Sequence, residues 1–257
     1  MNASRSTRWA ASLLLLLAAP GALSATIWVG RFAAGNAALP EPWQVQQLDE
    51  QVPTTRYTLR EWEGVHAVEA HAERSMALLG RPLDVDLAST PYLCWLWRVD
   101  APVTEADMSR KSGDDYAARV YLTFEVAPEA LGFGTRAKLA LARSIYGDQV
   151  PDAALNYVWD NRHPIGTLRD NAYTDRARML VLRSGAQDAG RWVLERRNIA
   201  DDFRLAFGDL PARLKGLALA SDTDNTGGVA HAGFAQFRFV TDADECRMPD
   251  DLAANAG

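Results

Sequence analysis

Residues 93–99 read Leu-Cys-Trp-Leu-Trp-Arg-Val, and this stretch decides the fold class. Leu93, Trp95, Trp97 and Val99 occupy alternate positions, so their side chains share one face of an extended strand. Four large apolar side chains on one face predict a strand that packs against a hydrophobic core. We therefore assign both tryptophans to the core and not to a ligand-stacking surface.

A second long strand is expected at residues 116–125. Its even-numbered positions, from Tyr116 to Phe124, are apolar or aromatic and would face one way. Arg119 and Tyr121 belong to the odd-numbered positions and would face the other way. The two strands together therefore predict sheets with one apolar and one polar face.

Short strands bounded by turn residues continue from about residue 43 to residue 240. Helical character is confined to residues 136–146 and to a short segment that Asp201 or Asp202 would cap. This pattern predicts a mainly β fold, an antiparallel β-sandwich resembling a jelly roll, with one or two short helices.

The first residues have the three parts of a secretory signal peptide. Arg5 and Arg8 precede an apolar run, and Ala22 to Ser24 form a small-x-small cleavage pattern. The run is shorter than a membrane span, so we expect cleavage, a periplasmic or secreted protein, and no integral membrane segment afterwards. The expected organisation is a signal peptide at 1–24, a lead-in at 25–42, a sandwich domain at 43–240 and an acidic flexible tail at 241–257.

Charge excludes one class of partner. The chain carries 27 basic and 33 acidic residues and a net charge of -6, with no long basic run, which argues against nucleic acid binding. Of the two cysteines, Cys94 lies in an apolar strand and Cys246 in a polar tail. Export permits a disulfide, but sequence spacing cannot establish proximity, so a bridge and two free thiols both remain open.

Charged residues that alternate with apolar ones suggest a ligand-binding sheet face. We expect Arg119, Tyr121, Glu195 and Arg197 to line one cleft, with Arg98 and Arg238 on the same polar face. Arginine binds carboxylates in a bidentate manner and aromatic rings stack on sugars, so an envelope glycan or an acidic small ligand is the expected partner. The competing interpretation is an ordinary solvated sheet face with cross-strand ion pairs.

Two other functions stay open, so the sequence does not decide whether the protein is an enzyme. A polysaccharide lyase would use Arg119 or Arg197 to neutralise a uronate and Tyr121 as a base, and a glycoside hydrolase would use a carboxylate pair. The third possibility is a structural or protein-interaction module of the cell envelope.

Residues 221–228 form an acidic loop. Asp222, Asp224 and Thr226 alternate before Gly227, as oxygen donors do at the start of a calcium loop. The twelfth position of such a loop would be Gly233 instead of an acid, so we favour a turn held by Asx hydrogen bonds, with no required cofactor. The four histidines show no metal-ligand spacing.

Four blocks in the same order resemble a known family. They are Trp95 to Asp100, Lys111 to Arg119, Trp192 to Asn198 and Ser221 to Gly227. These blocks are similar to the signatures of the domain of unknown function numbered 3047, a family of bacterial exported proteins. The resemblance implies a cell-envelope protein and transfers no catalytic residue.

Overall fold

The computed structural model describes residues 25–33, 38–146 and 150–248. The expected signal peptide at 1–24 and the end of the expected tail lie outside the described residues. Within the described part, no helix is long and apolar enough to cross a membrane.

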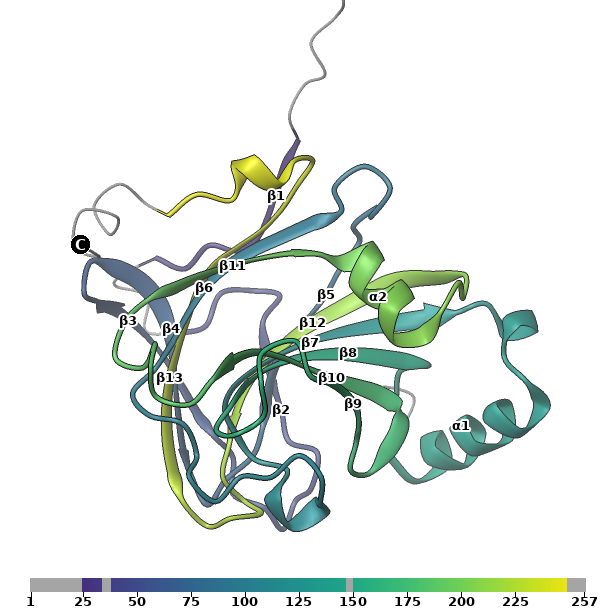
Figure 1. The fold of residues 1–257 in the computed structure, drawn as a ribbon, viewed down its shortest axis with the longest axis horizontal. Coiled ribbons are helices and arrows are strands. Elements are labelled where there is room, and N and C mark those ends of the chain that lie inside the picture. The colour runs from purple at the N-terminus through teal and green to yellow at the C-terminus, as the bar shows by residue number, and fades with distance from the viewer. Residues whose placement is uncertain (1–24, 34–37, 147–149, 249–257) are drawn as a thin grey trace, which may run out of the picture.

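The described residues form two sheets that pack face to face, so the predicted mainly β sandwich is confirmed (Figure 1). The six-stranded sheet has the order β11-β6-β13-β4-β3, with β1 paired to β13. Its strands are β1 (Thr26–Gly30), β3 (Arg56–Trp62), β4 (Val65–Glu73), β6 (Tyr92–Val99), β11 (Val193–Asn198) and β13 (Val229–Val240).

The seven-stranded sheet has the order β2-β5-β12-β7-β8-β10-β9. Every pair in it is antiparallel except β8 with β10, which run parallel. Its strands are β2 (Gln44–Gln46), β5 (Leu78–Pro82), β7 (Tyr116–Val126), β8 (Ala153–Asp160), β9 (Leu168–Asn171), β10 (Thr174–Ser184) and β12 (Ala212–Asp222).

The core lies between the two sheets and contains the apolar face of β6, as predicted. Trp95 stacks on Tyr157 of β8 with ring centroids 5.5 Å apart, and Trp97 packs against Trp159 at 5.6 Å. These aromatic contacts join one sheet to the other, and both β6 tryptophans are fully buried. Their assignment to the core is therefore confirmed.

Two α-helices accompany the described sheets. Helix α1 (Phe133–Tyr146) stands out from the sheets at one side of the molecule, and α2 (Ile199–Phe207) packs beside β8 and β11 (Figure 1). Asn198 caps α2 by accepting a hydrogen bond from the Asp201 backbone N–H, so the helix begins a few residues before the expected aspartate cap.

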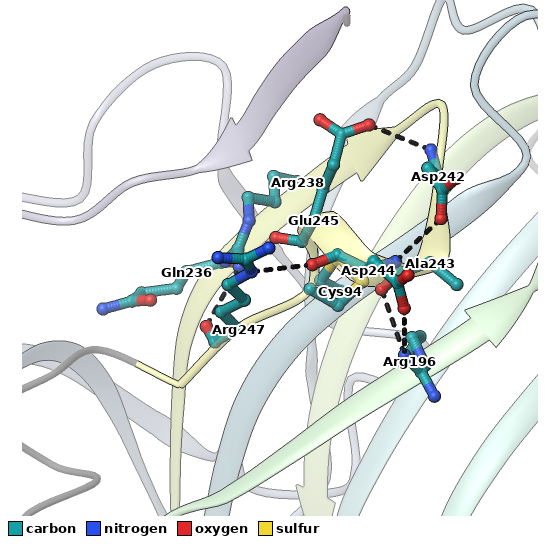
Figure 2. The surroundings of a disulfide bond; sticks show 10 residues. Cys94, Arg196, Gln236, Arg238, Asp242, Ala243, Asp244, Glu245 and Arg247 are labelled. Atoms are coloured by element: carbon teal, nitrogen blue, oxygen red, sulfur yellow. Dashed lines mark hydrogen bonds and ion pairs between the residues drawn. A yellow bond between two sulfur atoms is a disulfide. The ribbon is translucent and has the colours of Figure 1, made fainter.

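The ends of the domain are more ordered than expected. Strand β1 lies in the segment 25–42 and pairs with β13, so this segment is more than a lead-in. Residues 243–245 form a 3-10 helix, η3 (Ala243–Glu245), and a disulfide joins Cys94 to Cys246 (Figure 2). The Arg238 guanidinium donates to the carbonyls of Glu245 and Arg247, so the described part of the expected flexible tail is fixed to the six-stranded sheet.

Candidate functional site

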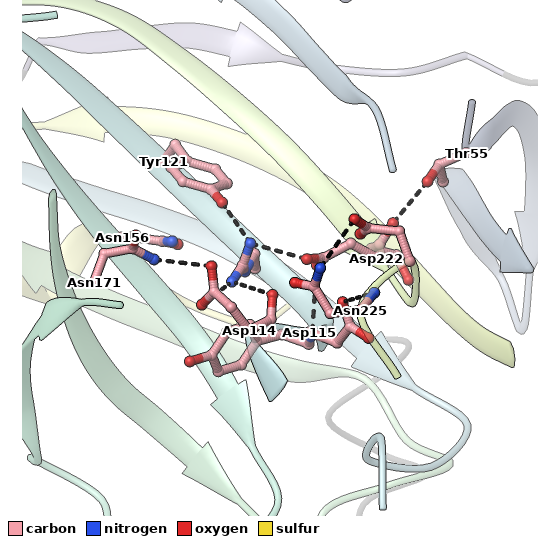
Figure 3. A network of polar contacts seen from close by, with 12 residues as sticks. Thr55, Asp114, Asp115, Tyr121, Asn156, Asn171, Asp222 and Asn225 are labelled. Carbon is pink, nitrogen blue, oxygen red and sulfur yellow. Dashed lines mark hydrogen bonds and ion pairs between the residues drawn. The ribbon is translucent and has the colours of Figure 1, made fainter. Parts of the chain in front are cut away.

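Arg119 is the centre of a buried polar network on the outer face of the seven-stranded sheet. Figure 3 shows the partners Asp114, Tyr121 and Asp222 of this network. The Arg119 guanidinium lies 2.8 Å from Asp114 Oδ1 and 2.9 Å from Asp222 Oδ2, and donates to the Tyr121 hydroxyl at 2.8 Å. Only 2% of Arg119 is exposed. Burial alone would lower the pKa of this group, but Asp114 and Asp222 outweigh burial and raise it. Arg119 is thus occupied by the protein's own carboxylates.

A β-bulge changes which residues accompany Arg119. The register between β7 and β12 shifts between the pairs Arg119–Ala220 and Tyr116–Asp222. The shift turns Tyr116 to the side of Arg119, whose guanidinium carbon lies 4.2 Å from the Tyr116 ring centroid. The prediction that Tyr116 faces the same way as the rest of the apolar row was therefore wrong, because a bulge interrupts the period of two.

The acidic loop after β12 is held by a residue from elsewhere in the chain. The Asp115 carboxylate accepts hydrogen bonds from the backbone N–H groups of Asn225 (3.2 Å) and Thr226 (2.6 Å). Asp222 instead accepts from the backbone N–H of Tyr116 at 3.3 Å. The main acceptor of the turn is therefore Asp115, which lies outside the loop, whereas the sequence favoured Asx hydrogen bonds made within it.

The carboxylates of Asp115, Asp222 and Asp224 offer oxygen atoms that all lie within 4.8 Å of one another. Thr226, an oxygen donor in the calcium alternative, contributes its backbone N–H to Asp115. Burial, opposed by Arg119 and reinforced by Asp115, raises the pKa of Asp222 well above its ordinary range. Burial and Asp115 likewise raise the pKa of Asp224. The cluster therefore crowds more negative charge than Arg119 neutralises, and it is a place where a proton or a cation would relieve repulsion.

We expect Asp224→Asn to stabilise the metal-free protein at pH 8 and to leave its stability unchanged at pH 4. The raised pKa means that the folded state holds the Asp224 proton more tightly than the unfolded state, so this group removes stability as pH rises through the folded pKa. The gain at pH 8 is about 0.5 kcal/mol, because water screens a half-exposed carboxylate. Urea unfolding in a chelator at the two pH values measures it.

The exposed carboxylate of Asp84 provides the matched control, since Asp84→Asn should change stability at neither pH. Destabilisation by Asp224→Asn at pH 8 would contradict the repulsion argument. A calcium-dependent rise in Tm that Asp224→Asn abolishes would instead identify these carboxylates as calcium ligands.

Glu195 and Arg197 lie in β11, in the other sheet, and face its inner side. Glu195 accepts from Trp97 Nε1 at 3.0 Å and from Arg183 Nε of β10 at 2.6 Å, so it ties the two sheets together. Burial raises the pKa of Glu195, and the hydrogen bonds from Arg183 and Trp97 oppose that rise. Arg197 pairs with Asp202 of α2, which also accepts from the Tyr157 hydroxyl. Glu195 is therefore bound by side chains of β6 and β10, and Arg197 is bound by α2.

The prediction of one cleft lined by Arg119, Tyr121, Glu195 and Arg197 was therefore wrong. Arg119 and Tyr121 share the outer face of the seven-stranded sheet, whereas Glu195 and Arg197 face inward from the six-stranded sheet. The role of Tyr121 as a lyase base also lacks support. Burial raises its pKa, only partly offset by Arg119, and a base at neutral pH needs the opposite shift.

A cleft of about 700 Å³ lies between α1 and the outer face of the seven-stranded sheet. Its floor includes Thr123 of β7, which lies two residues from Tyr121 on the same face. Leu131 and Leu139 supply an apolar wall. The charged side chains that line the cleft are Glu125, Arg136, Arg143, Asp152 and Lys215.

The cations of the cleft differ in how they are paired. Arg143 binds Asp152 at 2.9 Å and the Val150 carbonyl, while Lys215 lies 3.8 Å from Glu125. Arg136 is exposed and forms no ion pair with another described residue. Sequence reasoning missed this cleft, because Arg136 of α1 and Lys215 of β12 are distant in sequence and line one hollow only in the folded chain.

Comparison with known proteins gives a family match and a weak structural similarity. Residues 41–238 match the model of the family described as "Protein of unknown function (DUF3047)". No curated protein matches the chain. A family 30 carbohydrate-binding module of the cellulosomal cellulase Cel9D-Cel44B of Clostridium thermocellum superposes with a TM-score of 0.41 at 10% identity, covering 86% of this chain and 99% of the module.

Proposed function

We propose that this chain, which belongs to the DUF3047 family, binds an acidic, hydroxyl-rich ligand without chemically changing it. The observation that carries the proposal is the cleft beside α1, where three cations meet two carboxylates. A volume of about 700 Å³ suits a small ligand or a few sugar units.

The cleft offers the groups that such a ligand needs. Arg136 can receive a carboxylate in a bidentate manner, because no described carboxylate occupies it. Thr123 and Glu125 supply hydroxyl and carboxylate partners for sugar hydroxyl groups, and Leu131 gives an apolar surface for a sugar face. We place Tyr121 at the margin of this surface, where Arg119 fixes its hydroxyl and acts as a positioning residue.

The location of this activity follows from the N-terminal sequence. Residues 1–24 have the pattern of a signal peptide, so the ligand would be met outside the cytoplasm. An uronate-containing envelope or extracellular polysaccharide has the required chemistry, with one carboxylate among many hydroxyl groups on each unit.

We expect Arg136→Ala to abolish retention of the protein in a gel that contains polygalacturonate. The variant loses the unpaired cation of the cleft, and the exposed position predicts a change in folding stability within about ±0.5 kcal/mol. Affinity electrophoresis against polygalacturonate and neutral dextran measures retention, and added salt should weaken it.

Lys138→Ala is the matched control, because Lys138 is an exposed cation on the same helix but does not line the cleft. If the gel retains Lys138→Ala but not Arg136→Ala, the result supports ligand binding in the cleft. Equal behaviour of the two variants would show that charge alone, and not this cleft, retains the protein.

A further inference from the structure

Two histidines meet on the outer face of the six-stranded sheet, away from the cleft. His71 of β4 and His231 of β13 are directly opposed in the antiparallel register, and Nδ1 of His71 contacts Nε2 of His231. Their neighbours Ala70 and Ala232 are buried in the core, so the imidazoles lie on the opposite side of the sheet. Side chains 160 residues apart in sequence thus form one pair.

A carboxylate fixes the orientation of His231. Asp100 Oδ2 lies 3.2 Å from His231 Nδ1 and places the proton on that nitrogen. The lone pair of His231 is then at Nε2, the atom that faces His71. Metal-binding histidines are commonly held in this way, with one ring nitrogen donating to a carboxylate and the other free to bind the ion.

A third potential metal ligand, a carboxylate oxygen, lies near the same nitrogen. Glu69 Oε1 lies 3.8 Å from His231 Nε2. Arg60 and Thr58 donate to the two oxygens of Glu69, at 2.8 Å and 3.2 Å, and so hold the carboxylate toward the histidines. Two imidazoles and one carboxylate are the ligand types that zinc and related transition metals prefer.

Charged groups of both signs surround the histidine pair. Burial, together with His231 and Arg56, lowers the pKa of His71. The charged groups that surround the pair are Glu69, Glu73 and Asp100 on the acidic side and Arg56, Arg60 and Arg98 on the basic side. Arg98 is already paired with Glu63 at 2.7 Å and packs on the Trp62 ring.

We propose that His71, His231 and Glu69 bind a divalent transition-metal ion of the zinc class, and that Asp100 orients His231 for this role. Tetrahedral zinc would hold the two nitrogens about 3.3 Å apart, so a small rotation of either ring opens the pair around the ion. Water molecules complete the coordination, because both imidazoles are only partly buried. The ion would join β4 to β13 by their side chains.

The test uses the full mature chain without a histidine tag, and zinc chloride as the probe. We expect calorimetry to show one zinc ion per chain, with a rise in Tm that a chelator reverses. His71→Gln and His231→Gln should each weaken zinc binding at least about tenfold, and Asp100→Asn should weaken it through the orientation of His231. His163→Gln is the control and should leave binding unchanged, since His163 contacts Asp160 on a different loop.

Imidazole signals in the NMR spectrum of the wild-type protein give a second measurement that does not depend on a variant folding. The chain has four histidines, and zinc should shift the signals of His71 and His231 only. Binding should also weaken at acidic pH, because protons compete with zinc for the imidazole nitrogens. Absence of zinc binding at neutral pH, or shifts at His66 or His163 instead, would overturn the proposal.

Discussion

Arg119→Ala should destabilise the protein by about 3–5 kcal/mol, the cost of removing one partner from a buried ion pair. Asp114 and Asp222 would then lose their shared cation while they stay more than nine-tenths buried. Asp115 and Asp224 lie beside them, so repulsion in the cluster would rise further. Urea unfolding at pH 7 measures the loss directly.

The pH dependence separates this explanation from simple loss of packing. Burial already raises the folded-state pKa of Asp222, and the loss of Arg119, which opposes that rise, should raise it further. The folded variant would then bind more protons than the unfolded chain, so its stability should recover as pH falls from 7 toward 4. A loss of packing alone would be the same at both pH values.

Arg204→Ala provides the control for Arg119→Ala. Arg204 of α2 pairs with Asp201 at 2.9 Å, but 59% of its side chain is exposed. Surface pairs of this kind contribute little, so the expected change is within about 0.5 kcal/mol. A loss below about 1 kcal/mol for Arg119→Ala would contradict the structural role of Arg119 and return it to the list of possible ligand contacts.

The features that the sequence predicted are local ones. Alternation at Trp95 and Trp97 depends only on the geometry of one strand, and this is why their place in the core could be predicted. The two α-helices could also be predicted from the sequence, because helical periodicity and capping residues involve only a few neighbouring residues. Strand β9 was missed, since it has only four residues and no buried side chain.

The features that could not be predicted depend on which strands pair and in which register. Glu195 is opposite Trp95 across the β11–β6 pair, so it must share the inward face of that tryptophan. The sequence shows only that Glu195 alternates with apolar neighbours, which fits either face. A register different by one residue would have turned it outward.

The histidine pair and the hydrogen bonds from Asp115 to the acidic loop both result from the pairing of distant strands. His71 meets His231 only because β4 pairs with β13, and Asp115 reaches residues 225 and 226 only because β7 pairs with β12. Spacing rules for metal sites and turns consider neighbours in sequence, and neither contact joins neighbours. The polar chemistry of this chain is therefore built mainly between strands that are distant in sequence.

Removal of the disulfide should have the other large effect on stability. The bond between Cys94 and Cys246 closes a segment with a sequence separation of 152. Restriction of so long a loop in the unfolded chain predicts a contribution near the upper end of the usual 2–5 kcal/mol, about 4–5 kcal/mol in the loop-entropy account. The double variant Cys94→Ala, Cys246→Ala should lose this amount in urea unfolding.

The same variant should also release the C-terminal segment. Residues 243–246 are held over the six-stranded sheet by the disulfide, by the Arg238 contacts with the carbonyls of Glu245 and Arg247, and by Arg196, which donates to the Ala243 carbonyl at 3.2 Å (Figure 2). Without the covalent bond, these partly exposed hydrogen bonds are worth about 1 kcal/mol each, too little to order a chain terminus against its entropy. We expect faster amide hydrogen exchange at residues 243–247, while the buried strand β6 keeps its protection.

Reduction of the wild-type protein is the matched comparison, because it breaks the bond without changing any side-chain volume. Dithiothreitol should lower the wild-type stability to that of the double variant and leave the variant unaffected. If the reductant changes neither protein and the two unfold at the same urea concentration, the bond contributes nothing to stability. If the variant alone is unstable, the loss comes from the cavity at the fully buried Cys94 side chain instead of the unfolded-state restriction.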